Sequence, residues 1–199
     1  MLGKQRSEVL VVGAGPTGLY AALRLAERGI KVAVLDKHSR SGVHGYALAL
    51  HPRSLRLLAA DGITQALLGR GQKVGRVALW VDGNPAGSLD YSDLGGDYPF
   101  ALVLPQSVLE GELEERLRQK QVEVHWNHRV DSLKAEGEET LSEITRLDQV
   151  ASGYPVARME WAAVDKLRAR SQFVVAADGY HSLLRERLGL SYEQHGPVE

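Results

Sequence analysis

The chain has 199 residues, of which 44% are hydrophobic and 25% charged, a composition typical of a globular protein with a packed core. With 24 Lys and Arg against 25 Asp and Glu, the formal net charge of -1 gives no attraction for nucleic acid. Cysteine is absent, which excludes disulfide scaffolds, cysteine-ligated zinc and thiol nucleophiles, and the N-terminal apolar run is too short for a signal peptide or a membrane span. We therefore expect a cytoplasmic protein with no nucleic-acid partner and no membrane span.

The first predicted elements form a βαβ unit. Residues 9–12 and 32–35 are apolar strands, and the segment between them places apolar side chains at helical spacings of three and four. Gly29 follows this helix at the point where a left-handed residue is needed to end it. Because neither strand alternates with polar residues, we expect both in the buried middle of a parallel sheet.

A β-rich segment is predicted next. Residues 45–50 indicate a short strand, Pro52 fits the first turn of a helix, and a second short helix is expected after Thr64. Residues 73–104 predict a β-hairpin excursion whose turn lies at Asp82 to Pro85.

The helical period returns at Ser107, where Ser107 and Glu110 predict a capping box. A strand is expected over residues 122–126 and a β-meander of short strands over residues 131–171, with a turn at Ser152 and Gly153. The chain then predicts one more buried strand, FVVAA, followed by a helix that Ser182 opens.

A glycine-rich motif follows the first strand. Gly13, Gly15 and Gly18 form GxGxxG, and Asp36 stands at the end of the second strand. In a dinucleotide site, the first glycine permits the tight turn, the second lets a pyrophosphate approach, and the third lets the helix pack closely. Asp36 would accept hydrogen bonds from ribose hydroxyls. The alternative is a glycine turn that binds nothing. Neighbouring residues included among the candidate cofactor-binding residues are Pro16, Thr17 and Lys37.

A second candidate lies at the carboxyl end of the last strand. Asp178 and Gly179 stand at a strand-to-helix junction, where ligands of open α/β sheets collect. An ordinary Asp-Gly turn is the alternative. Gln106, between Pro105 and a helix, is a third candidate, against the alternative of an ordinary residue leading into the helix.

Four segments together resemble the FAD-dependent aromatic hydroxylases, single-component flavoprotein monooxygenases of the para-hydroxybenzoate hydroxylase type. The similarity extends over most of residues 8–190 and corresponds to the N-terminal part of such enzymes. The segments are GAGPTG with Asp36, GYALALHPRSLRLL, YPFALVLPQSVLEGELEERL and FVVAADGYHSLLRERLGL.

The resemblance implies an α/β fold in which a Rossmann-like FAD-binding domain carries a β excursion of a substrate domain. Residues 1–74 and 104–188 would be the FAD-binding domain, and residues 75–103 and 189–199 parts of the substrate domain. By position, the glycine motif and Asp36 would hold the ADP half of FAD, and Gln106 would contact the flavin nucleotide. Asp178 and Gly179 would support the pyrophosphate region, and Arg53 is a weaker candidate for an arginine contact to FAD.

The activity implied is hydroxylation of a small, aromatic substrate with O2, with NADH or NADPH as the electron donor. The cofactor would carry this chemistry, which explains the lack of a nucleophile or paired-carboxylate motif. We assign no catalytic acid or base and no metal site, because the seven histidines lack metal-ligand spacing. The alternatives are a non-catalytic FAD- or nucleotide-binding module and an NAD-dependent dehydrogenase. The oligomeric state is left open.

Overall fold

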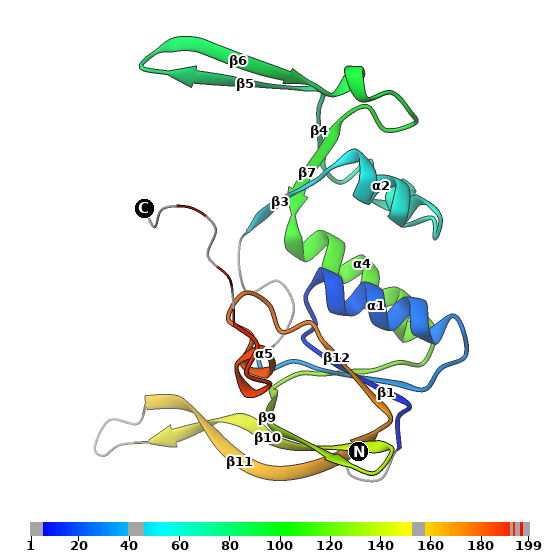
Figure 1. Ribbon diagram of the computed structural model, residues 1–199, viewed down its shortest axis with the longest axis vertical. Coiled ribbons are helices and arrows are strands. Elements are labelled where there is room, and N and C mark those ends of the chain that lie inside the picture. Colours follow the sequence, from blue (N-terminus) through cyan, green and yellow to red (C-terminus); the bar gives the residue numbers. More distant parts are fainter. Residues whose placement is uncertain (1–5, 40–45, 153–157, 192, 194–195, 197–199) are drawn as a thin grey trace. The chain divides into compact units, whose positions relative to one another are not determined.

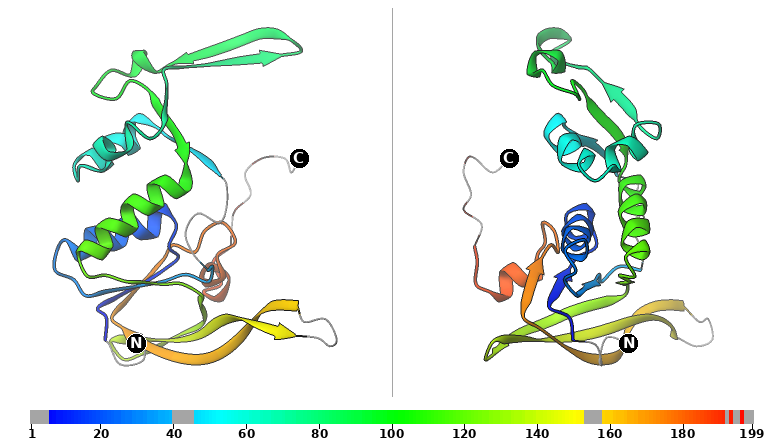
Figure 2. Two further views of the ribbon diagram at one scale, coloured as in Figure 1. Left: turned by 180° about the vertical axis from the view of Figure 1, so that it is seen from behind. Right: turned by 90° about the vertical axis from the view of Figure 1, so that its right-hand side faces the viewer.

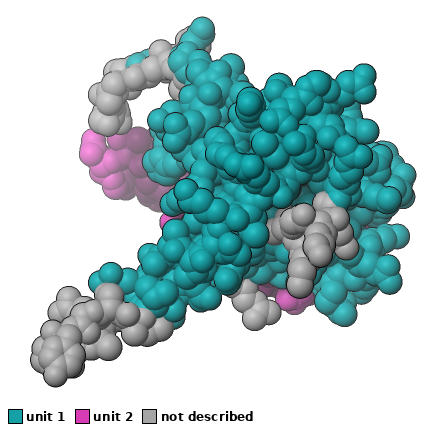
Figure 3. All heavy atoms as spheres, turned by 90° about the horizontal axis from the view of Figure 1, so that it is seen from below, with its two compact units in different colours: residues 1–41, 114–199 teal, residues 42–113 magenta. Residues whose placement is uncertain are grey.

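The computed structural model describes residues 6–39, 46–152, 158–191, 193 and 196. The chain divides into two compact units, coloured separately in Figure 3. Unit 1 comprises Met1–Ser41 and Glu114–Glu199, and unit 2 comprises Gly42–Leu113. No helix among the described residues is long and apolar enough to cross a membrane.

The centre of unit 1 is a four-stranded parallel sheet with the order β12-β1-β2-β8. Val9 pairs with Val32 on one side and with Phe173 on the other, so β1 lies between its neighbours. This parallel sheet, with its βαβ unit, is consistent with a Rossmann-like domain, which confirms the predicted fold class. The strands are β1 (Val9–Val12), β2 (Val32–Leu35), β8 (Val124–His125) and β12 (Phe173–Ala176).

Helix α1 (Pro16–Ala26) covers one face of this sheet, as Figures 1 and 2 show. It buries Leu19, Ala22 and Leu23 as the apolar spacing predicts. The helix ends in a left-handed turn at Gly29, whose φ is +76°, and Ile30 N donates to the carbonyl of Leu25 at 3.2 Å. The predicted βαβ unit and its glycine cap are therefore confirmed.

An antiparallel sheet packs against the opposite face of the parallel sheet. Its strands are β9 (His128–Glu136), β10 (Glu139–Ser152) and β11 (Arg158–Ser171), in the order β11-β10-β9. The predicted meander is confirmed, but β10 and β11 pair along their whole length with one register shift between Arg146 and Leu147. Each strand is 14 residues long, so the expectation of several short strands is wrong. Gly153 of the predicted turn lies outside the described residues.

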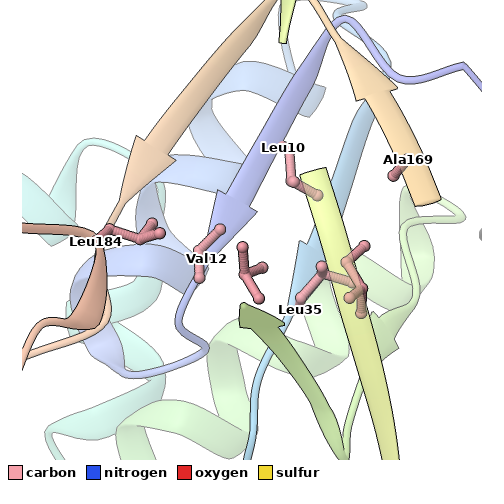
Figure 4. Close-up of a cluster of buried hydrophobic side chains, with 7 residues drawn as sticks. Leu10, Val12, Leu35, Ala169 and Leu184 are labelled. Atoms are coloured by element: carbon pink, nitrogen blue, oxygen red, sulfur yellow. The ribbon is translucent and has the colours of Figure 1, made fainter. Parts of the chain in front are cut away.

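Buried side chains from both sheets form one core (Figure 4). It also includes Leu184 from the short helix α5 (Leu183–Arg187), which Ser182 caps as predicted by accepting the Arg185 N–H at 3.0 Å. The helix after β12 is thereby anchored to the sheet. The fully or nearly buried members are Leu10, Val12, Leu35, Val130, Ile144, Ala169 and Leu184.

Two strand predictions in unit 1 need correction. The last strand is not buried: Phe173 is 66% exposed, because β12 is an edge strand that pairs only with β1 among the described residues. The strand expected over residues 122–126 is only β8. Val122 uses its N–H to close the preceding helix on Leu117, and Asn127 turns the chain with a φ of +61°.

Unit 2 contains a three-stranded antiparallel sheet and two short helices. The sheet has the order β3-β7-β4, from β3 (Ala47–Leu50), β4 (Gln72–Val74) and β7 (Ala101–Pro105). Gly45 of the predicted first strand lies outside the described residues. Helix α2 (Pro52–Ala59) begins at its proline as predicted, whereas α3 (Ile63–Leu67) already contains Thr64 because Gly62 is its N-cap.

The predicted hairpin is confirmed as β5 (Arg76–Val81) and β6 (Asn84–Asp90), followed by the 3-10 helix η2 (Tyr91–Leu94). Its turn is tighter than expected. Asp82 and Gly83 alone connect the strands, with φ values of +50° and +76°, and Pro85 already pairs with Trp80. Positive φ at both central residues is the form of turn that matches strand twist.

Helix α4 (Gln106–Gln119) begins one residue before Ser107, so the predicted capping box is wrong. Ser107 lies inside the first turn, and the Glu110 carboxylate accepts a hydrogen bond from Nε2 of Gln106 at 2.7 Å. The helix starts early because the Gln106 N–H donates to the carbonyl of Tyr46 at 2.8 Å as the chain leaves β7.

Candidate nucleotide-binding site

The loop after β1 requires glycine at its first position. Gly13 has a φ of +106°, and its N–H donates to the Leu35 carbonyl at 2.8 Å. A Cβ at Gly13 would lie 2.2 Å from the carbonyl oxygen of Ala177 and 2.9 Å from the backbone nitrogen of Asp178. The backbone of the glycine motif at Gly13 therefore packs directly against the backbone at the start of the Asp-Gly motif.

Gly18 is required by packing. A Cβ there would lie 1.9 Å from the Gly13 carbonyl oxygen and 3.2 Å from the Cβ of Ala177. This contact lets α1 begin directly against the end of β1, as the predicted role of the third glycine requires. The lack of a side chain at Gly13 and Gly18 is thus explained by the packing of the polypeptide itself.

Gly15 has no such explanation within the chain. Its φ of -73° and ψ of 177° are open to any residue, and a Cβ would meet nothing within 4 Å. Gly15 is the N-cap of α1, whose first turn contains no acidic residue. The N–H groups of Thr17 and Gly18 point out of this turn without partners within the helix, and Pro16 has no N–H. Open space beside the positive end of a helix fits an anionic group such as a pyrophosphate.

The Asp36 carboxylate is fixed at the end of β2. Its Oδ2 accepts the Ala14 N–H at 2.7 Å, and its Oδ1 accepts the His38 N–H at 2.8 Å. Nδ1 of the His38 ring lies 2.9 Å from the same Oδ1. The Asp36 side chain is 12% exposed, so the carboxylate is oriented by the loop that precedes α1. Lys37, next to it, is exposed.

The Asp178 side chain holds the start of α5. Its Oδ1 accepts the Ser182 hydroxyl at 2.6 Å, and its Oδ2 accepts the Leu184 N–H at 3.1 Å. The exposed Gly179 follows with a φ of +85°. The motif is thus a structural turn, as the alternative interpretation expected, and it also borders the glycine loop through Gly13.

The glycine loop, Asp36 and Asp178 follow the strands on either side of the point where the strand order of the parallel sheet changes direction. The chain passes from β1 to β2 on one side, while β12 lies on the other side of β1. Ligands of open α/β sheets bind outside the carboxyl ends of the strands at this position. Unit 1 therefore brings together the glycine motif, Asp36 and Asp178.

The other two candidates belong to unit 2. Gln106 opens α4 and bonds Glu110 through its side chain, and Arg53 is exposed in the first turn of α2. Their roles toward a nucleotide remain predictions.

Sequence reasoning missed the parts played by Ala14, His38 and Ala177. The Asp36 contact to the His38 N–H is an Asx turn, a local pattern that an aspartate directly after a strand can signal. The contact of Gly13 with Ala177 has no local signal, because it depends on the pairing of distant strands.

Two histidines, His125 and His128, lie at the end of β8 and just after it, and both bond the backbone of Asp36. The His125 carbonyl accepts the Asp36 N–H at 3.1 Å, and the His128 N–H donates to the Asp36 carbonyl at 2.7 Å. Burial lowers the pKa of His125, with a smaller contribution from the nearby His128. No group of three or more His, Asp or Glu among the described residues is arranged to hold a metal ion.

The fold and this loop geometry define an α/β dinucleotide-binding protein. The sequence matches the family described as FAD binding domain over residues 6–199, and the chain belongs to that family. This match confirms the assignment of FAD as the cofactor, and the relatives described next confirm the resemblance to FAD-dependent aromatic hydroxylases.

Two curated relatives are monooxygenases. The chain is 33% identical over 185 residues to 6-methylpretetramide 4-monooxygenase of Streptomyces rimosus, covering 92% of this chain and 30% of that protein. It is 30% identical over 189 residues to para-nitrophenol 4-monooxygenase of Pseudomonas sp. (strain WBC-3), covering 93% of this chain and 43% of that protein. The chain thus spans less than half the length of either relative.

A solved structure shows the same architecture. The p-nitrophenol 4-monooxygenase of Pseudomonas putida DLL-E4 superposes with a TM-score of 0.79 at 27% identity, over 94% of this chain and 45% of that chain.

Proposed function

We propose that this chain holds the ADP half of FAD in a monooxygenase that uses NADH or NADPH and O2 to hydroxylate an aromatic small molecule. The observation that carries the proposal is Gly15, whose open surroundings and ordinary backbone angles leave its lack of a side chain unexplained by the protein alone. A pyrophosphate at the N-terminus of α1 would explain it.

Each candidate cofactor-binding residue in unit 1 then has a definite role. The N–H groups of Thr17 and Gly18 face the pyrophosphate, and Asp36 accepts ribose hydroxyls. Asp178 fixes the turn at Gly179, which forms a second border of the pyrophosphate position. Lys37 and Pro16 flank these contacts, with Pro16 presetting the first turn of α1.

FAD, when bound, would supply the redox chemistry between NAD(P)H and O2 that the side chains lack. The relatives support an aromatic substrate, since their names specify para-nitrophenol and 6-methylpretetramide. Within this proposal, residues 1–74 and 104–188 form the FAD-binding domain and residues 75–103 and 189–199 belong to a substrate domain. Gln106, the first residue of α4, and Arg53, in the first turn of α2, contact FAD, and the enzyme acts in the cytoplasm, where NAD(P)H is available.

The test is a titration of the purified chain with FAD, followed by flavin fluorescence quenching, with NAD as a competitor. Gly15→Val should leave the circular dichroism spectrum unchanged and weaken FAD binding at least about 100-fold, because two charge-assisted hydrogen bonds of about 1.5–3 kcal/mol each are lost. Gly69→Val is the matched control, since a Cβ at Gly69 also meets nothing within 4 Å.

FAD binding that NAD does not displace supports the proposal. Displacement by NAD at similar concentrations would favour an NAD-dependent dehydrogenase, and unchanged FAD affinity in Gly15→Val would reject the site. NAD(P)H oxidation stimulated by a nitrophenol would separate a monooxygenase from a non-catalytic FAD-binding module.

A further inference from the structure

The hydrogen bonds that Asp36 already accepts leave too few acceptor positions on its carboxylate for both hydroxyls of a ribose. A carboxylate accepts about four hydrogen bonds, two at each oxygen. Among the described residues, the N–H and the ring Nδ1 of His38 occupy Oδ1, and the Ala14 N–H occupies one position of Oδ2. Since a carboxylate only accepts, the ring Nδ1 must be the donor. One of the four positions remains, whereas a ribose diol that binds with both hydroxyls needs two.

Two of the three donors cannot withdraw without a change in the backbone. The Ala14 N–H lies in the loop that Gly13 fixes against Leu35. The His38 backbone is held because its carbonyl accepts the Asn127 N–H at 2.9 Å. The ring of His38 differs, because its side chain is 53% exposed and a rotation about its side-chain bonds moves it away from Asp36.

We propose that the His38 ring occupies the second ribose-hydroxyl position on Asp36, and that the adenosine ribose must displace it. This inference rests on the proposed function, since it concerns the same nucleotide site. His38 is then a specificity-determining residue that weakens the binding of every ligand carrying both ribose hydroxyls. Loss of one net hydrogen bond corresponds to about a two- to tenfold change in affinity.

The expected result is tighter binding when the ring donor is removed. His38→Leu and His38→Phe should both bind FAD about two- to tenfold more tightly than the unmodified chain. His38→Phe keeps the bulk of the ring, so it separates the hydrogen bond from simple obstruction. Ser39→Ala, at the next exposed position, is the control and should bind FAD with unchanged affinity.

Two further measurements identify Asp36 and the diol as the partners. In an Asp36→Ala background, His38→Phe should have no effect on FAD affinity, because the contested acceptor is gone. By calorimetry, His38→Phe should tighten the binding of ADP but not of 2′-deoxy-ADP, which needs only the remaining position.

The outcomes separate this inference from the proposed function. FAD binding that His38→Phe and His38→Leu leave unchanged or weaken would overturn the inference and leave the proposed function standing. An equal gain in the Asp36→Ala background would also overturn it. If no variant bound FAD or ADP, both the proposed function and the inference would be wrong.

Discussion

The α-carbon of Gly13 faces the backbone of Ala177 so closely that a Cβ would lie 2.2 Å from the Ala177 carbonyl oxygen. The loop after β1 and the loop after β12 therefore lie against each other and together form one border of the proposed nucleotide site. A Cβ at Gly13 or at Gly18 would overlap backbone atoms, so the packing of the protein requires both glycines, whereas the space beside Gly15 is open to a ligand.

Gly18→Ala should destabilise the fold more than Gly15→Ala does. The Cβ added by Gly18→Ala would overlap the Gly13 carbonyl oxygen, a backbone atom that cannot move without displacing β1, and overpacking of this kind costs about 1–3 kcal/mol. Gly15→Ala adds a Cβ in open space and only replaces the N-cap glycine, so it should cost less, up to about 1 kcal/mol. Urea unfolding measures both, and equal stability of the two variants would contradict the assigned roles.

Asp178→Ala should loosen α5. The variant loses the acceptors of the Ser182 hydroxyl and the Leu184 N–H, and the loss of a helix cap costs about 0.5–2 kcal/mol. We expect a lower thermal midpoint and a smaller loss of FAD affinity than in Gly15→Val. Asp178→Asn retains one acceptor oxygen and should lie between Asp178→Ala and the unmodified chain.

Gln121→Gly should stabilise the protein. Gln121 has a φ of +60° after α4, where Val122 N donates to the Leu117 carbonyl at 2.9 Å in a left-handed helix end. Removing the strained side chain should raise the unfolding free energy by about 0.5–1 kcal/mol. The reciprocal variant, Gly29→Gln at the end of α1, should lower it by a similar amount. A destabilised Gln121→Gly would show that the side chain contributes more than its backbone conformation costs.

Asp131 should make stability depend on acid pH. Burial opposes its ionisation most strongly, but hydrogen bonds from the Thr145 hydroxyl and Arg129, with the charges of Arg129 and Lys166, together hold the pKa of Asp131 below its usual 3.8. A carboxyl pKa that is lower in the folded state stabilises the fold above the unfolded value, and this contribution is lost as the pH falls through the folded value.

The measurement is the urea midpoint of Asp131→Asn between pH 7 and pH 2. The variant should be less stable than the unmodified chain at pH 7, and the difference should shrink below pH 3.8. Asp97→Asn, at an exposed loop position, is the control. A difference that stayed constant over this range would show that the ionised carboxylate is not the source of stability.

Local patterns predicted most of the elements correctly. The apolar run at Val9–Val12, the helical spacing of Leu19 and Leu23, and Gly29 each depend on neighbouring residues, and each is confirmed. The exposure of Phe173 could not be predicted, because an apolar run looks the same in an edge strand and a central one.

The position of the candidate site was partly predictable. GxGxxG and Asp36 pointed to the loop after β1, and the structure brings them together with Asp178 in unit 1, while their role toward a nucleotide stays a prediction. The hydrogen bonds of Ala14 and His38 to Asp36 depend on the exact path of the backbone, which spacing alone does not specify. The division of tasks among the three glycines became clear only from what surrounds each of them.

The parallel pairing of β1 with β12 joins residues from opposite ends of the chain, since Val9 pairs with Phe173. During synthesis, which proceeds from the N-terminus, the glycine loop emerges early but lacks the backbone of Ala177 that packs against Gly13. Until β12 has been made and has docked, the nascent chain has a βαβ unit without the second border of the proposed nucleotide site. We therefore expect FAD to bind the nascent chain only after β12 has been synthesised.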